Sequence, residues 1–262
     1  MEKESILIEW LSEGVCEITL HRPEVKNALD EKMINEFQKH LVHLKNKKEL
    51  RVLIITGSGD SFCAGADLKW MKKSAKFSRE ENIQDAKAFA KMLNVLDKIP
   101  RPTIAKINGH SFGGGLGILS SCDFAIASKN SKFCFSEVRL GMIPAMISPY
   151  IIRNVGSKIS KQLFLTGEIF SADYANRINL IDKVVKEEEL EKEVAKLINL
   201  LMKGGPEAQG SIKELLSLVS DKPIDNKMAQ LTSEKIAEKR VSIEGQEGME
   251  AFFNKRAPNW QK

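Results

Sequence analysis

Residues 107–117 read Ile-Asn-Gly-His-Ser-Phe-Gly-Gly-Gly-Leu-Gly, and this stretch decides the fold of the central part of the chain. It follows a β-prone run at 103–107 and precedes the apolar residues 118–119, which predicts a strand, a turn and a helix. The glycines from Gly113 to Gly115 would let a ligand approach the backbone, and the first N–H groups of a helix lack intrahelical acceptors. The helix dipole adds partial positive charge there. The stretch is equally compatible with a site for phosphate or a developing oxyanion and with a tightly packed strand–helix junction.

The same stretch contains a G-x-S-x-G pattern at 109–113, which is typical of the nucleophile elbow of serine hydrolases. In that fold the histidine base follows the serine along the chain. The four histidines of this sequence all lie at or before position 110. Without such a base the hydroxyl of Ser111 is a weak nucleophile at neutral pH. We therefore attribute the match to chance.

A second loop, residues 61–70, reads Ser-Phe-Cys-Ala-Gly-Ala-Asp-Leu-Lys-Trp and follows a predicted buried strand at 52–56. Its small residues at 64–66 leave a backbone N–H accessible, and Asp67 is a suitable N-cap for a following helix. An ordinary capped loop would have the same composition. Two loops of this kind, however, suggest an oxyanion hole with two backbone donors.

A third segment places Glu137 directly after a strongly apolar strand near 132–135. Partial burial would raise the pKa of this carboxyl group and suit it to proton transfer. A salt bridge to Arg139 or a solvated strand end is the alternative. His40 and His43 have helical i, i+3 spacing but are surrounded by lysines and have no evident third ligand, so no metal site is predicted.

The composition limits the classes of function. The 262 residues are 42% hydrophobic and carry a net charge of +5, with charges of alternating sign and no basic cluster that would indicate nucleic-acid binding. No run of 18 apolar residues predicts a membrane span, and the first five residues do not resemble a targeting signal. Four cysteines without C-x-x-C spacing predict reduced thiols. We expect a cytoplasmic protein with neither a membrane nor a nucleic-acid partner.

The pattern along the chain predicts an α/β core to about residue 200. Strands and helices alternate in the first half, and the pattern after Pro149 is almost entirely helical. We expect residues 1–200 to form the core and residues 201–262 to form a helical region packed on it.

Four ordered motifs carry a resemblance to a known family. They are HRPEVKNAL (21–29), SFCAGADLKWM (61–71), INGHSFGGGLG (107–117) and SEVRLGMIPAMISPYIIRNVG (136–156). In this order and spacing, over essentially the whole chain, the sequence resembles the enoyl-CoA hydratase/isomerase (crotonase) family. The resemblance implies a spiral of ββα units, a C-terminal helical region that forms homotrimers, often paired into hexamers, and an acyl-CoA thioester substrate.

The resemblance also implies roles for individual residues. It makes the backbone N–H groups of Ala66 and Gly114 the oxyanion hole, with Glu137 as the acid/base. It implies no metal and no permanently bound cofactor, because coenzyme A enters as the carrier part of the substrate. The residues expected along coenzyme A are Lys26, Ala28, Ala64, Asp67, Leu68, Lys69 and Gly113.

One position departs from the family pattern. Family hydratases carry two glutamates, and this sequence has Gly117 at the first of these positions. One glutamate suffices for a Δ3,Δ2-enoyl-CoA isomerase. The segments around 140–156 and 244–260 are nevertheless similar to bacterial methylglutaconyl-CoA hydratase-like members.

We therefore expect hydration of a short, branched or carboxylated 2-enoyl-CoA such as 3-methylglutaconyl-CoA. Ser148, Val155 and Gly156 lie in the segment expected to shape the acyl pocket. The alternatives are an isomerase that uses Glu137 alone and a non-catalytic CoA-binding protein.

Overall fold

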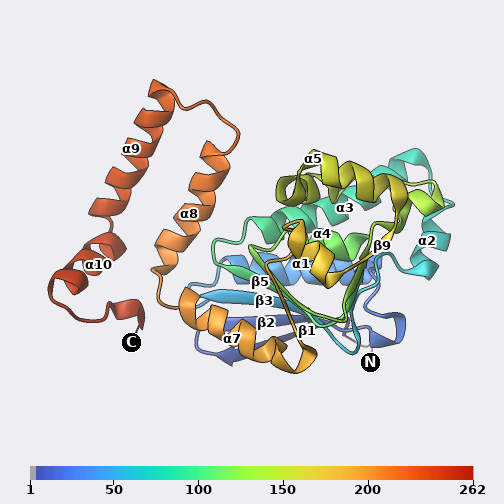
Figure 1. Cartoon of the computed structure of the whole chain (residues 1–262), viewed down its shortest axis with the longest axis horizontal. Helices are drawn as coiled ribbons and strands as arrows, with labels where there is room; N and C mark the ends of the chain where they lie inside the picture. The colour runs from blue at the N-terminus through green and yellow to red at the C-terminus, as the bar shows by residue number, and fades with distance from the viewer. Residues whose placement is uncertain (1–3, 262) are drawn as a thin grey trace.

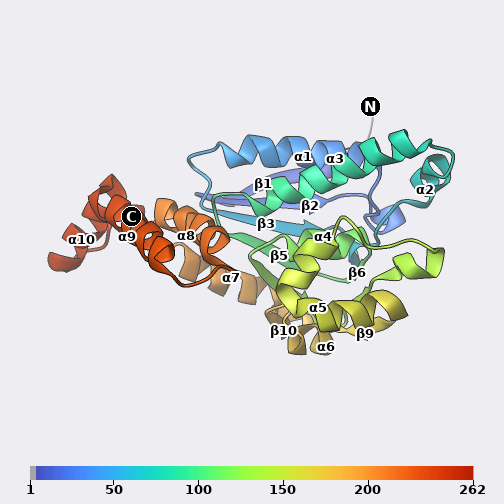
Figure 2. The same ribbon diagram turned by 90° about the horizontal axis from the view of Figure 1, so that it is seen from above.

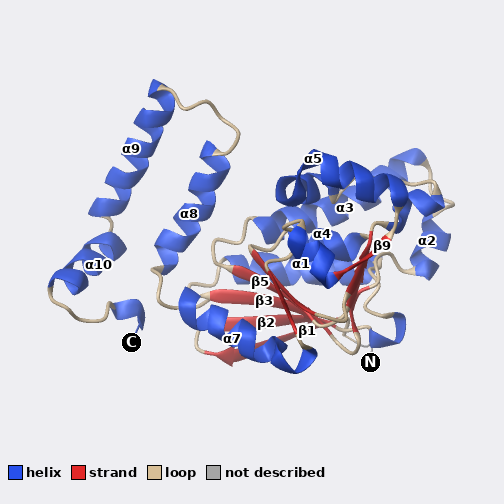
Figure 3. Ribbon diagram, viewed as in Figure 1, coloured by secondary structure: helices blue, strands red, loops and turns tan. Residues whose placement is uncertain are grey.

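Two β-sheets stand at the centre of the structure, a computed structural model that describes residues 4–261 (Figure 3). The strands are β1 (Ile6–Ser12), β2 (Val15–Leu20), β3 (Val52–Gly57), β4 (Ser61–Cys63), β5 (Thr103–Ile107), β6 (His110–Phe112), β7 (Phe124–Ser128), β8 (Lys132–Cys134), β9 (Ile169–Ser171) and β10 (Lys183–Val185). Among the described residues, one sheet has six strands in the order β1-β2-β3-β5-β7-β10, and the other has four in the order β4-β6-β8-β9.

Ten α-helices accompany the sheets within residues 4–261. They are α1 (Glu31–Lys45), α2 (Leu68–Ser74), α3 (Arg79–Asp97), α4 (Gly114–Ser120), α5 (Ser148–Thr166), α6 (Ala172–Arg177), α7 (Leu190–Leu201), α8 (Pro206–Val219), α9 (Asn226–Val241) and α10 (Ile243–Phe253).

From β3 to β8, successive strands alternate between the two sheets. β3, β5 and β7 pair in parallel in the larger sheet, and β4, β6 and β8 pair in parallel in the smaller one. Along the chain, the strand pairs β1–β2, β3–β4, β5–β6 and β7–β8 are each followed by a helix. The predicted α/β spiral of ββα units is therefore confirmed.

The strand β3 of the larger sheet is buried on both faces, which explains its continuous apolar run. Leu53 and Ile55 belong to the main core, which also contains the apolar faces of α1 and α3. Val52 and Ile54 point to the other face, where they pack in a second cluster with Val194 of α7. Figure 2 shows α1 and α3 side by side along one face of this sheet. The strand therefore has no polar face, as expected of a parallel strand covered on both sides.

Local signals in the sequence explain where the first long helix begins. The side chain of Asp30 accepts the Met33 N–H at 2.8 Å and caps α1. The element α5 consists of two helices that meet at a kink at Gly156, where φ is 75° and ψ is 163°. This agrees with the two separate helical patterns at 150–155 and 158–166, and glycine adopts the positive φ of the kink without steric cost.

Helices α8, α9 and α10 form an arm beside the core (Figure 1). They contact one another, and two arginines hold their base to the core. Arg51 donates hydrogen bonds to the carbonyls of Gly204 and Trp260 at 2.8 and 3.0 Å. Arg101 pairs with Glu207 at 2.8 Å. Across residues 4–261, no helix is both long enough and apolar enough to cross a lipid bilayer.

Candidate active site

Three neighbouring parallel strands bring the three predicted segments to one edge of the smaller sheet. The loop at 64–67 follows β4, the glycines at 113–115 follow β6, and Glu137 comes shortly after β8. Parallel strands that are neighbours end at the same edge, so segments far apart in the sequence meet there.

The two glycine-containing loops are in close contact. A Cβ on Gly65 would lie 2.9 Å from the carbonyl oxygen of Phe112 and 3.6 Å from the Cα of Gly113. A Cβ on Gly113 would lie 3.4 Å from Oε1 of Glu137. Both glycines also have positive φ, 90° and 48°, which other residues rarely adopt. Glycine is therefore required here both by the backbone conformation and by the close approach of the loops to the carboxylate.

The expected oxyanion donors have free N–H groups. Neither Ala66 nor Gly114 donates a backbone hydrogen bond among those recorded for residues 4–261. The neighbouring N–H groups are used: Asp67 donates to Leu29 and Gly113 donates to Cys134, both at 2.9 Å. The Gly114 N–H begins α4, so the helix itself supplies no acceptor for it. Two unpaired donors on contacting loops can stabilise negative charge on one oxygen atom.

Glu137 lies on the helical turn Ser136–Leu140, half-buried. Its Oε2 is buried and has no hydrogen-bond partner within the described chain. Burial raises the pKa of this carboxyl group above its usual value of 4.5. Among the ion pairs of residues 4–261, none joins it to Arg139, the alternative that the sequence allowed. An unpaired carboxyl group with a raised pKa is suited to accept and return a proton.

The space beside Gly117, one turn further along α4, is filled by apolar side chains. A Cβ at this position would lie 2.3 Å from Cγ2 of Ile147 and 3.2 Å from Cδ1 of Leu93. A Cβ on Gly114 would meet Leu29 at 2.9 Å and Phe89 at 3.2 Å. No carboxylate fits at position 117 while Ile147 holds this place. An apolar wall therefore lies next to Gly114 and Gly117. We define this wall by four buried residues, Leu29, Phe89, Leu93 and Ile147.

The residues expected along coenzyme A fall into exposed and buried groups. Lys26, Leu68 and Lys69 are exposed, Ala64 is half-buried, and Ala28 is buried. The Ala64 N–H donates to the Lys26 carbonyl at 2.9 Å, so the two expected segments lie side by side.

Asp67 differs from the other expected contacts because its carboxylate has internal partners. The N–H groups of Lys69 and Trp70 donate to Oδ1 at 2.7 and 3.1 Å, and Arg22 binds Oδ2 at 2.9 Å. Burial acts to raise the pKa of Asp67, but these donors together hold it below its usual value. The prediction that Asp67 caps a helix is confirmed.

The structure gives Ser111 no role as a nucleophile. Its side chain is fully buried and its Oγ has no partner in the described part of the chain. Oγ lies 2.9 Å from where a Cβ on Gly115 would stand.

Within residues 4–261, no cluster of three histidine, cysteine or acidic side chains could hold a metal ion.

Two features of the neighbourhood were not predicted. Arg22 and Asn27 hold the segment beside the Ala66 loop, although the sequence showed them only within the HRPEVKNAL motif. Cys63 ends β4 directly before that loop, and burial raises the pKa of its thiol to about 12.

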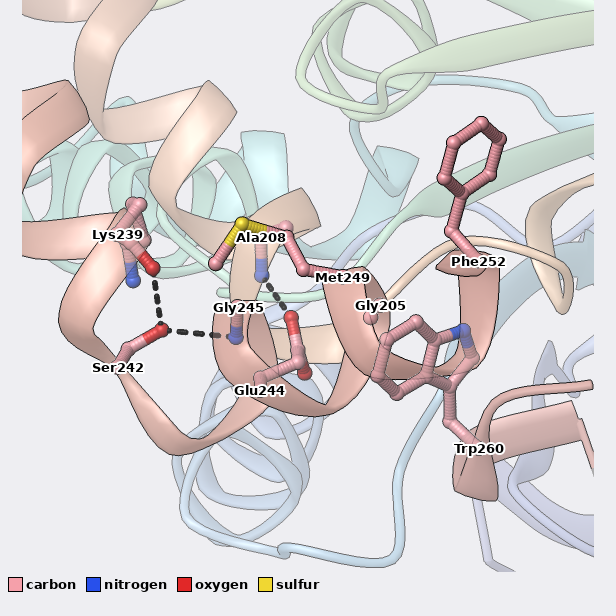
Figure 4. A pocket seen from close by; sticks show the side chains of 10 residues that line it. Gly205, Ala208, Lys239, Ser242, Glu244, Gly245, Met249, Phe252 and Trp260 are labelled. Carbon is pink, nitrogen blue, oxygen red and sulfur yellow. Dashed lines mark hydrogen bonds between the residues drawn. The ribbon is translucent and has the colours of Figure 1, made fainter. Parts of the chain in front are cut away.

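A separate cavity of about 330 Å³ lies in the arm and is lined by Glu244, Met249 and Trp260 among others (Figure 4). It lies outside the site formed by the three loops.

Comparison with known proteins identifies the family of the chain. Residues 11–262 match the family model described as enoyl-CoA hydratase/isomerase. A crotonyl-CoA hydratase of Syntrophomonas wolfei is 34% identical, with 99% of each chain covered. A short-chain-enoyl-CoA hydratase of Clostridium acetobutylicum is also 34% identical, over 98% of this chain and 97% of that protein. The crystal structure of an enoyl-CoA hydratase from Shewanella pealeana matches with a TM-score of 0.95 and 40% identity, over 98% of this chain and 96% of that one. The chain therefore belongs to the enoyl-CoA hydratase/isomerase family.

Proposed function

We propose that this protein is an enoyl-CoA hydratase that adds water across the double bond of a 2-enoyl-CoA thioester. The observation that carries the proposal is the meeting of two free N–H groups, on Ala66 and Gly114, with the buried carboxyl group of Glu137 at one sheet edge. The thioester oxygen accepts hydrogen bonds from both N–H groups. Negative charge that develops on this oxygen during the reaction is thereby stabilised.

In the proposed reaction Glu137 moves the protons. Its ionised carboxylate takes a proton from water while the water oxygen bonds to the β-carbon, and the electron pair of the double bond shifts toward the thioester oxygen. Glu137 then returns the proton to the α-carbon, and the charge on the oxygen disappears. One carboxyl group with a raised pKa can serve both steps.

For the substrate we propose a short acyl chain, branched or carboxylated, with 3-methylglutaconyl-CoA as the carboxylated representative. The apolar wall of Leu29, Phe89, Leu93 and Ile147 suits a methyl branch near the reacting carbons. We propose that the coenzyme A part lies along residues 26–28 and 64–69, with Lys26 and Lys69 close to its phosphates. Since Asp67 uses its carboxylate internally, its contact with coenzyme A would involve the backbone.

A second reaction, Δ3,Δ2-enoyl-CoA isomerisation, is favoured by a specific contact. Ile147 fills the space in which a second carboxylate at position 117 would stand. Isomerisation needs only that one group carry a proton between the α- and γ-carbons, and Glu137 can do this alone.

We further propose that residues 1–200 form the catalytic core and residues 201–262 an assembly region that makes homotrimers, or hexamers from two trimers. Supporting this, the arm leaves large apolar side chains exposed, among them Ile243 at 92% and Phe252 at 79% of their surface. Apolar surface of this kind marks contacts with another protein chain.

The decisive experiment follows the ultraviolet absorbance of the enoyl thioester. Loss of absorbance with crotonyl-CoA or 3-methylglutaconyl-CoA would establish hydration, and a gain with a 3-enoyl-CoA would establish isomerisation. Glu137→Gln should lower turnover by at least about 100-fold, because a positioned acid/base contributes about 10²–10⁴-fold. Glu188→Gln, an exposed glutamate on another surface, serves as the matched control and should keep wild-type activity. If Glu137→Gln kept wild-type turnover on every substrate, the assigned role of Glu137 would be wrong.

A further inference from the structure

Arg22 contacts the two segments that meet at the Ala66 loop, residues 28–30 and Asp67. Its Nη1 donates to the Ala28 carbonyl at 2.7 Å and lies 2.9 Å from Oδ2 of Asp30. Its Nη2 donates to Oδ2 of Asp67 at 2.9 Å. The arginine side chain is only 18% exposed, so these contacts are little weakened by water.

The two carboxylates that Arg22 binds are both helix caps. Asp30 uses its Oδ1 to accept the Met33 N–H in the first turn of α1. Asp67 uses its Oδ1 to accept the N–H groups of Lys69 and Trp70 in the first turn of α2. One guanidinium group therefore links the starts of two helices, with a planar donor geometry that lysine cannot reproduce.

The direction of the Ala66 N–H depends on this linkage. The Leu29 N–H donates to the Gly65 carbonyl at 2.7 Å, and the Asp67 N–H donates to the Leu29 carbonyl at 2.9 Å. Successive N–H groups in an extended segment point in opposite directions. In this parallel pairing of Leu29 with Ala66, the Ala66 N–H therefore points away from Leu29, and a shift of residues 28–29 would displace the backbone that carries it.

The two residues directly before this segment have an uncommon backbone conformation. Lys26 and Asn27 both have positive φ, 53° and 55°, which persists only where the surrounding structure enforces it. The Asn27 side chain fixes one end, because its Nδ2 donates to the carbonyls of Ser58 and Ser61 at 2.9 and 2.8 Å. The guanidinium group of Arg22, on the Ala28 carbonyl, fixes the other end.

We infer that Arg22 is a positioning residue for the oxyanion hole: it aims the Ala66 N–H at the thioester oxygen without touching the substrate. This inference rests on the proposed function. It implies that loss of Arg22 weakens stabilisation of the transition state more than it weakens binding of the coenzyme A part.

The kinetic test uses Arg22→Met and Arg22→Lys. For Arg22→Met we expect kcat to fall about 10- to 100-fold with KM changed less than about threefold, since removing a whole oxyanion donor costs about 10²–10³ in kcat. Arg22→Lys keeps the charge without the planar fork and should give an intermediate kcat. An unchanged kcat in Arg22→Met would overturn the inference, as would a rise in KM alone.

A spectroscopic test separates this inference from the proposed function. Isotope-edited infrared spectra of bound butyryl-CoA report how strongly hydrogen bonds polarise the thioester carbonyl. In the wild type the carbonyl stretch should move to lower frequency on binding, and in Arg22→Met it should return toward its value in solution. Equal shifts in the two proteins would overturn the role of Arg22. No shift in a wild type saturated with ligand would instead contradict the proposed oxyanion hole itself.

Arg101→Met is the matched control. Arg101 is also a nearly buried arginine that binds a carbonyl and a carboxylate, those of Leu50 at 2.9 Å and Glu207 at 2.8 Å, but it lies at the base of the arm. This control should lose stability and keep the wild-type carbonyl shift. If Arg22→Met failed to fold, Arg22→Lys would carry the same comparison, with a shift between those of the wild type and free ligand expected.

Discussion

The burial that suits the Glu137 carboxyl group to proton transfer also lowers the stability of the folded protein when this group is ionised. Burial without a hydrogen-bond partner for Oε2 raises its pKa above 4.5. The folded protein therefore binds this proton more tightly than the unfolded chain does. Stability that depends on Glu137 is lost as the pH rises from 4.5 through the raised pKa, because the buried carboxylate then becomes charged.

Two pH profiles test this. Since the ionised form of Glu137 takes the first proton, kcat/KM, which reports ionisations of the free enzyme, should increase with pH along an acid limb whose midpoint lies above 4.5. Glu137→Gln should unfold at a higher temperature than the wild type at pH 7, and the difference should vanish below about pH 4, where an ordinary carboxyl group is protonated. Circular dichroism at each pH would confirm that the proteins remain folded. An acid limb at or below 4.5 would contradict the burial argument.

At the scale of elements, prediction succeeded where a pattern was long, but it found only some of the short strands: β8 was expected near 132–135, whereas β4, β6 and β9 were not. Helix α1 was readable because five buried positions repeat with helical spacing after a capping aspartate. The strand β3 was readable from its unbroken apolar run. By contrast β4, β6 and β9 have three residues each, too few to show an alternation. These short strands belong to the sheet that gathers the site, so the meeting of its loops could not be derived from periodicity.

The close contact between Gly117 of α4 and Ile147 predicts how substitutions at these two positions change the free energy of unfolding. In Gly117→Ala the new Cβ would stand 2.3 Å from Cγ2 of Ile147, so we expect a loss of about 1–3 kcal/mol, typical of overpacking. Ile147→Ala alone should lose about 2–5 kcal/mol. In the Ile147→Ala background, Gly117→Ala should cost less, because the 2.3 Å contact is gone and only those at 3.1 Å to Cβ of residue 147 and 3.2 Å to Cδ1 of Leu93 remain. The better helix propensity of alanine offsets these by up to about 1 kcal/mol.

Urea unfolding of the four proteins in this cycle measures the coupling. The cost of Gly117→Ala should be smaller when residue 147 is alanine than when it is isoleucine. Strictly additive changes would mean that Ile147 moves aside without difficulty, and the apolar wall would then be a weak barrier to a larger side chain at position 117.

At the scale of the whole molecule, the exposed apolar residues of the arm predict self-association. Ile243→Ser combined with Phe252→Ser should convert a trimer or hexamer into monomers, measured as molar mass by light scattering. Val42→Ser, which replaces an exposed apolar residue on α1, is the control and should keep the wild-type mass. A wild type that is monomeric at all concentrations would contradict the proposed assembly.

The sequence predicted the class of fold and the residues that converge, but not how they are held. The ordered motifs located Ala66, Gly114 and Glu137 on three segments, which the structure places after adjacent strands. Arg22 escaped notice because its three partners are spread over residues 28–67, and no spacing rule connects a guanidinium group with two helix caps. The packing of Ile147 beside Gly117 could not be predicted either, because a sequence pattern does not show which side chain fills the space next to a glycine.

Two buried cysteines lie directly before loops of the site, and their burial affects how their thiols react with oxidants. Two of the three loops begin directly after a cysteine, Cys63 at the end of β4 and Cys134 at the end of β8. Burial raises the pKa of both thiols, and the thiolate is the form that reacts with peroxide or alkylating reagents. Because burial disfavours the thiolate of both cysteines, we expect the activity of the site to resist peroxide and alkylating reagents at neutral pH.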